Sequence, residues 1–396
     1  MKTLQQSFSV PFKYAIHFTN GLFKLDNPVF KEVFVNDPHY RKKILFFIDE
    51  EVSKNHPQLI SEIETYAKTH LGYYDLCGGP QVIPGGEQVK NGSKWVDFVL
   101  DQINVKGIDR QSYVLAIGGG AVLDMVGYAA SIAHRGVRHI RIPTTVLSQN
   151  DSGIGVKNSV NAFGKKNFLG NFTPPFAVLN DFDFLTTLND RDWRGGISEA
   201  VKVALIKDLE FFNFIKLNAE DLRNRKMEPM KYLVHRCAEM HMEHIGGGDP
   251  FEAGSSRPLD FGHWAAHKLE QQTKYRIRHG EAVAIGIALD TAYSYLSGNI
   301  SKIAFEQVID LIKDLGLNLY ISEMEEVEND KSTLCLVNGL NEFREHLGGT
   351  LTIMLLSSLG KGIEVHTMDA DIVFRSIQLL KKYQQQEVNI EMRSVK

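Results

Sequence analysis

Two histidines, His263 and His267, stand four residues apart in the stretch LDFGHWAAHKLE, residues 259–270. Residues four apart lie on the same face of a helix, so both imidazoles could bind one metal ion or one substrate. The pattern lacks the glutamate of the HExxH zinc motif and is therefore weak evidence by itself. Other donors occur at Glu199 in GGISEAVKVALI and at His279 in RHGEAVAIGIAL. A Glu/His/His set with one open position is typical of catalytic zinc, but the spacing equally allows hydrogen-bonded structural residues.

A run of three glycines lies in LAIGGGAVLDMVG, residues 115–127, where a strand-like pattern passes into a helical one. Glycines at such a junction let backbone N–H groups approach a phosphate, and the helix N-terminus attracts it. The match to GxGxxG is imperfect because Leu123 stands where the third glycine belongs. A tight turn without a ligand is the alternative, although the strand-to-helix context favours nucleotide binding. Asp124 could contact the cofactor or only complement the helix dipole.

Cationic and amide side chains gather in the segment 144–168, which contains Lys157, Lys166 and Asn167 among glycines and short polar residues. Lysines and an asparagine on loops can bind a phosphate through charge and N–H donors, and Arg135 could add a bidentate contact. A solvated hairpin with surface lysines is the alternative. The nearby glycine-rich junction favours the phosphate-binding interpretation.

The secondary-structure patterns around these residues differ between the two halves of the chain. Strand-like runs alternate with helical stretches in the first half of the chain, which predicts a parallel, doubly wound sheet; the strand-like runs are KKILFFID (42–49), SYVLAI (112–117) and HIRIPTT (139–145). Helical patterns dominate afterwards, until the strand-like LTIMLLSS; they cover 195–216, 226–244, 261–273, 280–297 and 301–315. We therefore predict an α/β, Rossmann-like domain over residues 1–188 and a mainly α-helical domain over residues 189–396.

Composition excludes several classes of function. A chain of 396 residues is longer than one hydrophobic core usually supports, which agrees with two domains. The net charge of −4 gives no electrostatic basis for binding nucleic acid or an anionic membrane. Three widely separated cysteines form neither a disulfide framework nor a CxxC site. No stretch resembles a signal peptide or a membrane span, so we expect a cytoplasmic protein.

The order of the motifs is more specific than any one of them. It runs PGGEQVKN, IGGGAVLDMVG, RGVRHIRIPTTVLSQNDSGIGVKNSVN, GKKNFLGNF, GGISEAVKVALI, LDFGHWAAHKLE and RHGEAVAIGIAL. In this order, from about residue 40 to residue 300, the chain resembles the dehydroquinate synthase family of sugar phosphate cyclases. The stretch GGGDPFEAGSSRPLDFGHWAAHKLE resembles most the EboD-type, dehydroquinate synthase-like branch.

The resemblance implies three sets of site residues. Zn²⁺, or Co²⁺ in its place, would be bound by Glu199, His263 and His279. NAD would be bound by Asp49, Glu87, Lys90, Gly119, Gly120, Asp124, Thr144, Thr145 and Thr187. Catalysis would involve Lys202, His267, Asp151, Lys157, Asn167 and Asp260, and the substrate would also contact Arg135, Lys166 and Arg257. Lys202 stands three residues after Glu199, so one helix face would present both.

The resemblance also implies the reaction. A carbon–oxygen lyase of this type oxidises its sugar phosphate transiently, eliminates phosphate, reduces the product again and closes a carbocycle by an intramolecular aldol step. The small-molecule substrate would be a sugar phosphate, and the enzyme would be a homodimer.

Three positions depart from the usual family pattern. Asp260 stands where dehydroquinate synthases usually have asparagine, His241 replaces a substrate-binding lysine, and Trp264 replaces a small threonine and would narrow the pocket. An added acid and a lost cation disfavour a substrate carboxylate, so a heptulose phosphate or a related sugar phosphate is expected. Two alternatives stay open: a metal-dependent alcohol or glycerol-type NAD dehydrogenase, and a non-catalytic NAD-binding component of a pathway.

Overall fold

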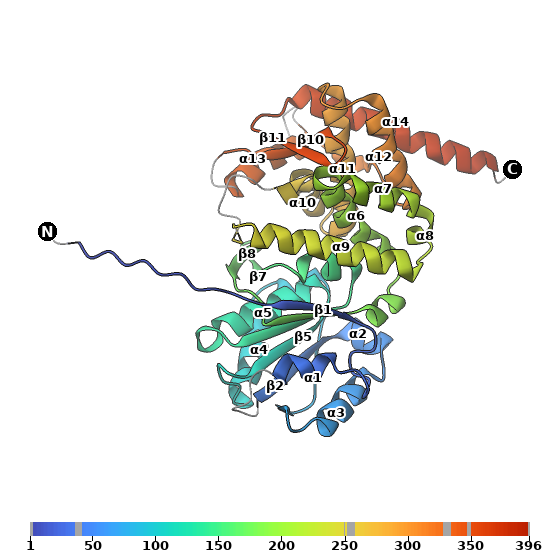
Figure 1. Ribbon diagram of the computed structural model, residues 1–396. Helices are drawn as coiled ribbons and strands as arrows, with labels where there is room; N and C mark the ends of the chain where they lie inside the picture. The colour runs from blue at the N-terminus through green and yellow to red at the C-terminus, as the bar shows by residue number, and fades with distance from the viewer. Residues whose placement is uncertain are drawn as a thin grey trace. The chain divides into compact units, whose positions relative to one another are not determined.

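The computed structural model describes residues 3–35, 42–248, 250–251, 258–327, 334–346 and 350–394. The chain forms two compact units (Figure 1). The first comprises Met1–Thr144 and Ser152–Thr187, and the second comprises Thr145–Asp151 and Leu188–Lys396. The expected division after residue 188 thus differs from the observed one chiefly in the short segment Thr145–Asp151, which belongs to the second unit.

A seven-stranded parallel sheet forms the centre of the first unit. Its strands are β1 (Ala15–Thr19), β2 (Lys42–Asp49), β3 (Tyr74–Leu76), β4 (Gln81–Ile83), β5 (Tyr113–Gly118), β6 (Arg138–Pro143) and β9 (Ala177–Asp181). The order is β1-β9-β6-β5-β2-β3, and β4 also pairs with β2. The helices of this unit are α1 (Val29–Val35), α2 (Glu50–Asn55), α3 (Leu59–Thr69), α4 (Lys94–Val105) and α5 (Gly120–Ile132). The predicted parallel α/β architecture is confirmed.

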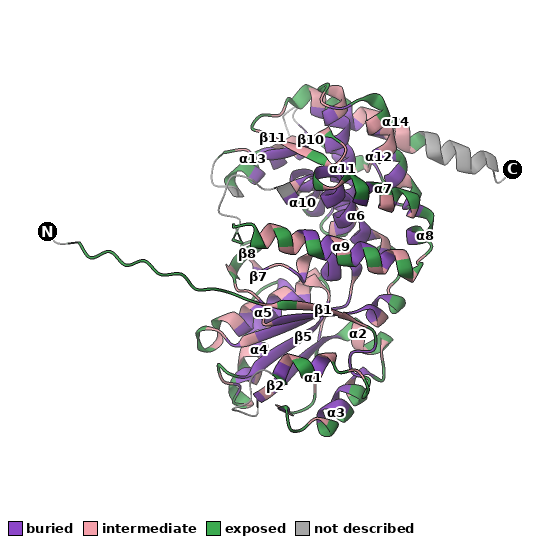
Figure 2. Ribbon diagram, viewed as in Figure 1, coloured by how far each residue is buried: buried purple, intermediate pink, exposed green. Residues whose placement is uncertain are grey.

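Strand β2 shows why the sheet is covered on both faces. Its alternate residues belong to two different cores: Ile44 and Phe46 pack with α1 and α3, whereas Leu45 and Phe47 pack with α4 and α5. Successive side chains of a strand point to opposite faces, so a continuous apolar run must be buried from both sides. The central strand β5 is likewise buried throughout (Figure 2).

A β-hairpin stands apart from the sheet in the first unit. It pairs β7 (Lys157–Ala162) with β8 (Lys165–Phe172). Its two turn residues, Phe163 and Gly164, have φ values of 55° and 71°. Positive φ at both turn positions matches the twist of the flanking strands, which is the geometry of a two-residue hairpin.

The second unit is mainly helical, as predicted. Its helices are α6 (Asp190–Lys207), α7 (Leu209–Leu217), α8 (Ala219–Arg223), α9 (Met227–Gly246), α10 (His263–Gln272), α11 (His279–Leu296), α12 (Lys302–Asp314), α13 (Cys335–His346) and α14 (Ala370–Ser394). A two-stranded sheet pairs β10 (Ile353–Ser358) with β11 (Lys361–Val365). Among the described residues, no helix combines the length and apolarity that crossing a membrane requires.

One predicted helix proves to be two. The pattern over 195–216 divides at Asp208, whose φ of −147° and ψ of 97° are not helical. Its carboxylate accepts a hydrogen bond from the backbone N–H of Phe211 and so caps α7. An aspartate that caps one helix ends the preceding one, although the apolar periodicity continues across it.

Candidate functional site

Glycine contacts bring the three helices α6, α10 and α11 of the second unit together. A Cβ atom on Gly280 of α11 would lie 2.0 Å from the carbonyl oxygen of Gly195 in α6. A Cβ atom on Gly286 would lie equally close to the carbonyl oxygen of Gly262, which precedes α10. Any larger residue would force these backbones apart. The helices that carry the predicted metal ligands can therefore converge.

Glu199, His263 and His279 meet at one point, although α6, α10 and α11 are far apart in sequence. An oxygen of Glu199 lies 3.5 Å from Nε2 of His263 and 3.4 Å from Nε2 of His279. Glu199 is fully buried, and neither of its carboxylate oxygens accepts a hydrogen bond of ordinary geometry from a described residue. A buried carboxylate facing two imidazole nitrogens is a donor set that suits Zn²⁺.

Outer contacts fix the orientation of both imidazoles. Nδ1 of His279 lies 3.0 Å from the carboxylate of Glu270, and Nδ1 of His263 lies 3.2 Å from the carbonyl oxygen of Phe261. Each acceptor favours a proton on Nδ1 and leaves Nε2 as the lone-pair donor, as in zinc sites with a carboxylate–histidine pair. A second group of donors, His267, Glu270 and His279, shares His279 with the first.

Lys202 extends the same face of α6. Its ammonium lies 2.5 Å from the second oxygen of Glu199, and both side chains are buried. Burial would lower the pKa of Lys202, but the carboxylates of Glu199, Asp151 and Asp260 outweigh it and raise that pKa. Burial would likewise raise the pKa of Glu199, but Lys202 and His263 hold it well below its usual value. The pair is therefore charged.

The segment Thr145–Asp151 supplies acidic and polar groups next to α6 and α9. Nδ2 of Asn150 donates to the carbonyl oxygen of Gly196, which ties the segment to α6. The carboxylate of Asp151 lies 3.4 Å from Nδ1 of His241 in α9. The predicted residues Asp151 and His241 are thus neighbours.

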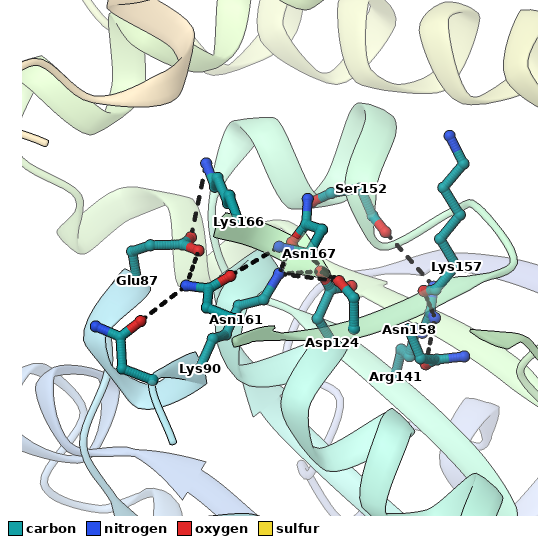
Figure 3. Close-up of polar contacts among 12 residues, drawn as sticks. Glu87, Lys90, Asp124, Arg141, Ser152, Lys157, Asn158, Asn161, Lys166 and Asn167 are labelled. Carbon is teal, nitrogen blue, oxygen red and sulfur yellow. Dashed lines mark hydrogen bonds and ion pairs between the residues drawn. The ribbon is translucent and has the colours of Figure 1, made fainter. Parts of the chain in front are cut away.

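A polar network in the first unit joins several predicted cofactor and substrate residues (Figure 3). The buried ammonium of Lys90 donates to Asp124 at 2.7 Å, to Ser159 at 3.1 Å and to Oδ1 of Asn167. Alongside it, Glu87 accepts a hydrogen bond from Asn161 at 2.9 Å and lies 3.8 Å from Lys166. The hairpin β7–β8 therefore brings Lys166 and Asn167 to the predicted NAD-binding residues.

The carboxyl ends of β2 and β5 fit a dinucleotide. Asp49 ends β2, and burial raises the pKa of its carboxyl group, against the hydrogen bond from Glu51 that lowers it. A Cβ atom on Gly85 would lie 2.3 Å from this carboxylate, and one on Gly118 would lie 3.1 Å from its Cβ. Next to β5, Gly119 caps the N-terminus of α5. A carboxylate beside a glycine-rich strand-to-helix turn is the arrangement that binds the ribose and pyrophosphate of a nucleotide.

Family models match most of the chain. The 3-dehydroquinate synthase N-terminal model matches residues 80–195, and the 3-dehydroquinate synthase C-terminal model matches residues 196–334. The chain belongs to the 3-dehydroquinate synthase family. It is accordingly a 3-dehydroquinate synthase-like cyclase, which confirms the predicted enzyme class of carbon–oxygen lyase.

Several members are similar to it over most of their length. The 3-dehydroquinate synthase of Campylobacter fetus subsp. fetus is 35% identical over 66% of this chain and 78% of its own. The 2-epi-valiolone synthase of Actinosynnema mirum is 34% identical over 71% of this chain and 73% of its own. A solved structure of the 2-epi-5-epi-valiolone synthase from Streptomyces hygroscopicus subsp. jinggangensis 5008, with NAD⁺ and Zn²⁺ bound, is 27% identical, has a TM-score of 0.83 and covers 96% of this chain and all of that one.

Of the remaining predicted cofactor residues, Thr144 and Gly120 lie at the glycine-rich turn, whereas Thr145 and Thr187 have other neighbours. Thr144 follows β6, and its N–H donates to the carbonyl oxygen of Gly118. Oγ1 of Thr187 lies 2.9 Å from Nε2 of His56 in the first unit. Thr145 belongs to the second unit and bonds with Ser148. A Cβ atom on Gly120 would lie 2.6 Å from the hydroxyl of Ser152, so that turn also permits a close approach.

Two predicted substrate residues are not brought to the network around Lys90, and a third is not described. Lys157 is exposed at the start of β7 and extends away from that network (Figure 3). Arg135 is exposed before the first residue of β6, whereas the glycine-rich turn follows the last residue of the adjacent parallel strand β5. Arg135 therefore lies at the amino ends of the parallel strands, whereas the glycine-rich turn lies at their carboxyl ends. Arg257 lies outside the described residues.

The prediction that Trp264 narrows the substrate pocket is wrong. Its indole is 1% exposed, and its Nε1 donates to a carboxylate oxygen of Asp290 in α11 at 2.8 Å. A buried indole needs an acceptor for its N–H, and Asp290 supplies one within the helical core. Trp264 is therefore a packing residue between α10 and α11.

Sequence reasoning missed Arg141, the fully buried guanidinium of β6. It donates to the carbonyl oxygens of Gly153 and Gly155. It also donates to the carbonyl oxygen of Lys157 and to Oδ1 of Asn158 (Figure 3). Arg141 thereby shapes the loop before β7. An arginine inside an apolar strand pattern was the available signal, because a cation is buried only where acceptors surround it.

Proposed function

We propose that the protein is an NAD- and divalent-metal-dependent sugar phosphate cyclase whose substrate is a heptulose phosphate or a related sugar phosphate without a carboxylate. The observation that carries the proposal is the convergence of Glu199, His263 and His279, with outer partners that direct both Nε2 atoms inward. When bound, zinc or cobalt would act as a Lewis acid on a substrate hydroxyl, and NAD would accept and return a hydride.

The side chains of the chain have separate roles in this proposal. Lys166 and Asn167 bind the substrate phosphate, and they stabilise the charge that develops as phosphate leaves. Asp49, Asp124 and the turn at Gly119 orient the dinucleotide. Lys202 holds a proton beside the carboxylate of Glu199 and stabilises negative charge on a substrate oxygen there.

The acidic groups near Lys202 support the substrate class. Oδ2 of Asp260 is buried and accepts no hydrogen bond from a described residue, and Asp151 lies near the same ammonium. A buried carboxylate oxygen without a donor binds a hydroxyl group favourably and repels a carboxylate. Two acids and one lysine thus favour a polyhydroxylated sugar carbon at this position. The 2-epi-valiolone synthase among the relatives supports a carboxylate-free product.

Three finer assignments belong to the same proposal. The motif GGGDPFEAGSSRPLDFGHWAAHKLE supports membership in the EboD-type branch. A homodimer and a cytoplasmic location are expected by analogy with the family.

The proposal is tested by incubating the purified protein with NAD⁺, Zn²⁺ and a panel of sugar phosphates, including sedoheptulose 7-phosphate and 3-deoxy-D-arabino-heptulosonate 7-phosphate. We expect stoichiometric phosphate release from a carboxylate-free sugar, a carbocyclic product by mass spectrometry and no net NADH. Net NADH without phosphate release would identify a dehydrogenase instead. Bound NAD with neither product would identify a non-catalytic binding protein, and activity only on the carboxylated sugar would overturn the substrate class.

A further inference from the structure

Helices α10 and α11 each carry one predicted metal ligand and one buried carboxylate. Helix α10 contains His263 and Glu270, and helix α11 contains His279 and Asp290. The carboxylate of Glu270 contacts the ligand of the other helix directly, at Nδ1 of His279. Asp290 has no role in the proposed reaction and contacts no predicted ligand side chain, so its burial requires a separate explanation.

Asp290 binds the two residues on either side of His263. One of its oxygens accepts the backbone N–H of Gly262 at 2.9 Å, and the other accepts Nε1 of Trp264 at 2.8 Å. The carboxylate is fully buried, and within the described part of the chain each of its oxygens accepts one hydrogen bond. These two bonds fix the backbone on one side of His263 and the side chain on the other.

The start of α10 needs such support. Gly262 caps the helix in a left-handed conformation, with φ of 77°, and offers no side chain to its first turn. Its carbonyl oxygen is also in close contact with Gly286 of α11. A small rotation at Gly262 would move the imidazole of His263, and metal ligands tolerate displacements of only about 0.5 Å.

The chemistry of Asp290 indicates a positioning role more than a stabilising one. Burial raises the pKa of its carboxyl group to about 7, although the hydrogen bonds from Trp264 and Gly262 lower it. Among the described residues Asp290 has hydrogen bonds from Trp264 and Gly262 but no ion pair with a cation. An ionised carboxylate is costly to bury under these conditions, and an apolar residue of similar volume would cost less. The free-energy cost of burying Asp290 is explained if the carboxylate is needed to hold the Gly262 N–H and the Trp264 indole in place around His263.

We propose that Asp290 is a positioning residue for the metal ligand His263, and that Trp264 is the second donor that sets the orientation of its carboxylate. The role rests on the proposed function, since it requires that Glu199, His263 and His279 bind the metal. Helices α10 and α11 then position each other's ligands: Glu270 orients His279, and Asp290 orients the segment that carries His263.

The test measures Zn²⁺ affinity by competition with a chromophoric chelator. Asp290→Asn keeps the volume but has one acceptor oxygen and one NH₂ group in place of two acceptor oxygens, so one of the two donors loses its partner. We expect affinity to fall about 10- to 100-fold, the range for outer partners of metal ligands. In Asp290→Asn/Trp264→Phe the indole donor is absent and the asparagine oxygen can accept from Gly262. Affinity should return toward the wild-type value, which a merely structural role would not produce.

Ser294→Ala is the matched control, because Ser294 is buried on the same helix and accepts the N–H of Leu356 in β10. It should lower the melting temperature and leave zinc affinity unchanged. Wild-type affinity in Asp290→Asn, a double variant weaker than the single one, or an equal loss in Ser294→Ala would each overturn the role of Asp290.

Two further variants keep the outcomes distinct. Zinc binding that survives Glu199→Ala would overturn the metal centre itself. Binding lost in Glu199→Ala but unchanged in Asp290→Asn would overturn only the present inference. If Asp290→Asn does not fold, Trp264→Phe alone should weaken zinc binding several-fold, and unchanged affinity there would contradict the inference.

Discussion

The polar groups around Lys90 in the first unit and those around Glu199 in the second are both buried, but they are satisfied differently. The ammonium of Lys90 has three hydrogen-bond acceptors from the chain itself: Asp124, Ser159 and Asn167. One oxygen of Glu199 forms an ion pair with Lys202, and the other faces two imidazole nitrogens. Neither oxygen accepts a hydrogen bond of ordinary geometry from a described residue.

The difference separates a self-contained network from a set of ligands. Buried polar groups cost free energy when they lack partners, so the first arrangement contributes to folding as it stands. The second directs lone pairs toward one point, which becomes favourable when a cation is bound there. Removing a residue from the first should therefore affect stability, and removing one from the second should affect metal binding.

The largest expected effect comes from Glu199→Ala. The loss of the shared carboxylate should reduce bound zinc to background, as measured by elemental analysis. The rate of phosphate release should fall about 10³-fold or more, which corresponds to an activation barrier raised by about 4 kcal/mol. The fold should persist by circular dichroism, since Asp151 and Asp260 remain near Lys202. Full zinc occupancy in this variant would remove Glu199 from the ligand set.

Glu270→Gln should have a smaller effect. The amide keeps an oxygen near Nδ1 of His279 but loses the negative charge, so the imidazole becomes a weaker donor to the metal. Zinc affinity, measured by chelator competition, should fall about 10- to 100-fold. An affinity equal to that of the wild type would mean that Glu270 does not support the ligand.

Lys90→Met tests the prediction that the polar network around Lys90 contributes to folding stability and not to metal binding. It leaves Asp124 and Asn167 without their shared cation, so the free energy of unfolding in urea should fall by about 1.5–3 kcal/mol. Zinc affinity should not change. Lys165→Met, an exposed lysine in the same hairpin as Asn167, serves as the control and should be neutral. A loss of zinc without a loss of stability in Lys90→Met would reverse the comparison.

The last prediction concerns the pH dependence of stability. In the folded protein the pKa of Asp290 is raised to about 7, from 3.8 in an ordinary environment. The folded state therefore holds this proton more tightly than the unfolded state between these values, and the contribution of Asp290 to stability falls as the pH rises through this window. With a chelator present, the melting temperature of Asp290→Asn relative to the wild type should rise from pH 4 to pH 7 and then level off. A constant difference would show that Asp290 ionises normally.

The sequence predicted the parts of the fold whose patterns are local. Strands β2 and β5 are continuous apolar runs beside turn residues, and α11 (His279–Leu296) lies within one residue of the expected range 280–297. Strands β1 and β9 were missed, because each is only five residues long and β9 ends in Asn180 and Asp181. Their pairing joins the two ends of the first unit's sequence, a long-range contact that no local pattern specifies.

The candidate site followed from family resemblance more than from spacing. Glu199, His263 and His279 converge through contacts such as Gly195 with Gly280, which side-chain patterns do not reveal. The role of Asp290 was missed for a related reason. A single aspartate within the small apolar residues of α11 is a visible signal, but its donors depend on how α10 packs against it.

The most direct test of the metal centre is a crystal structure of the zinc-loaded protein, with diffraction data collected on both sides of the zinc absorption edge. We expect one anomalous peak about 2.0–2.2 Å from a carboxylate oxygen of Glu199 and from Nε2 of both His263 and His279. A peak bound by other residues, or side chains of these three that do not share one ion, would contradict the account.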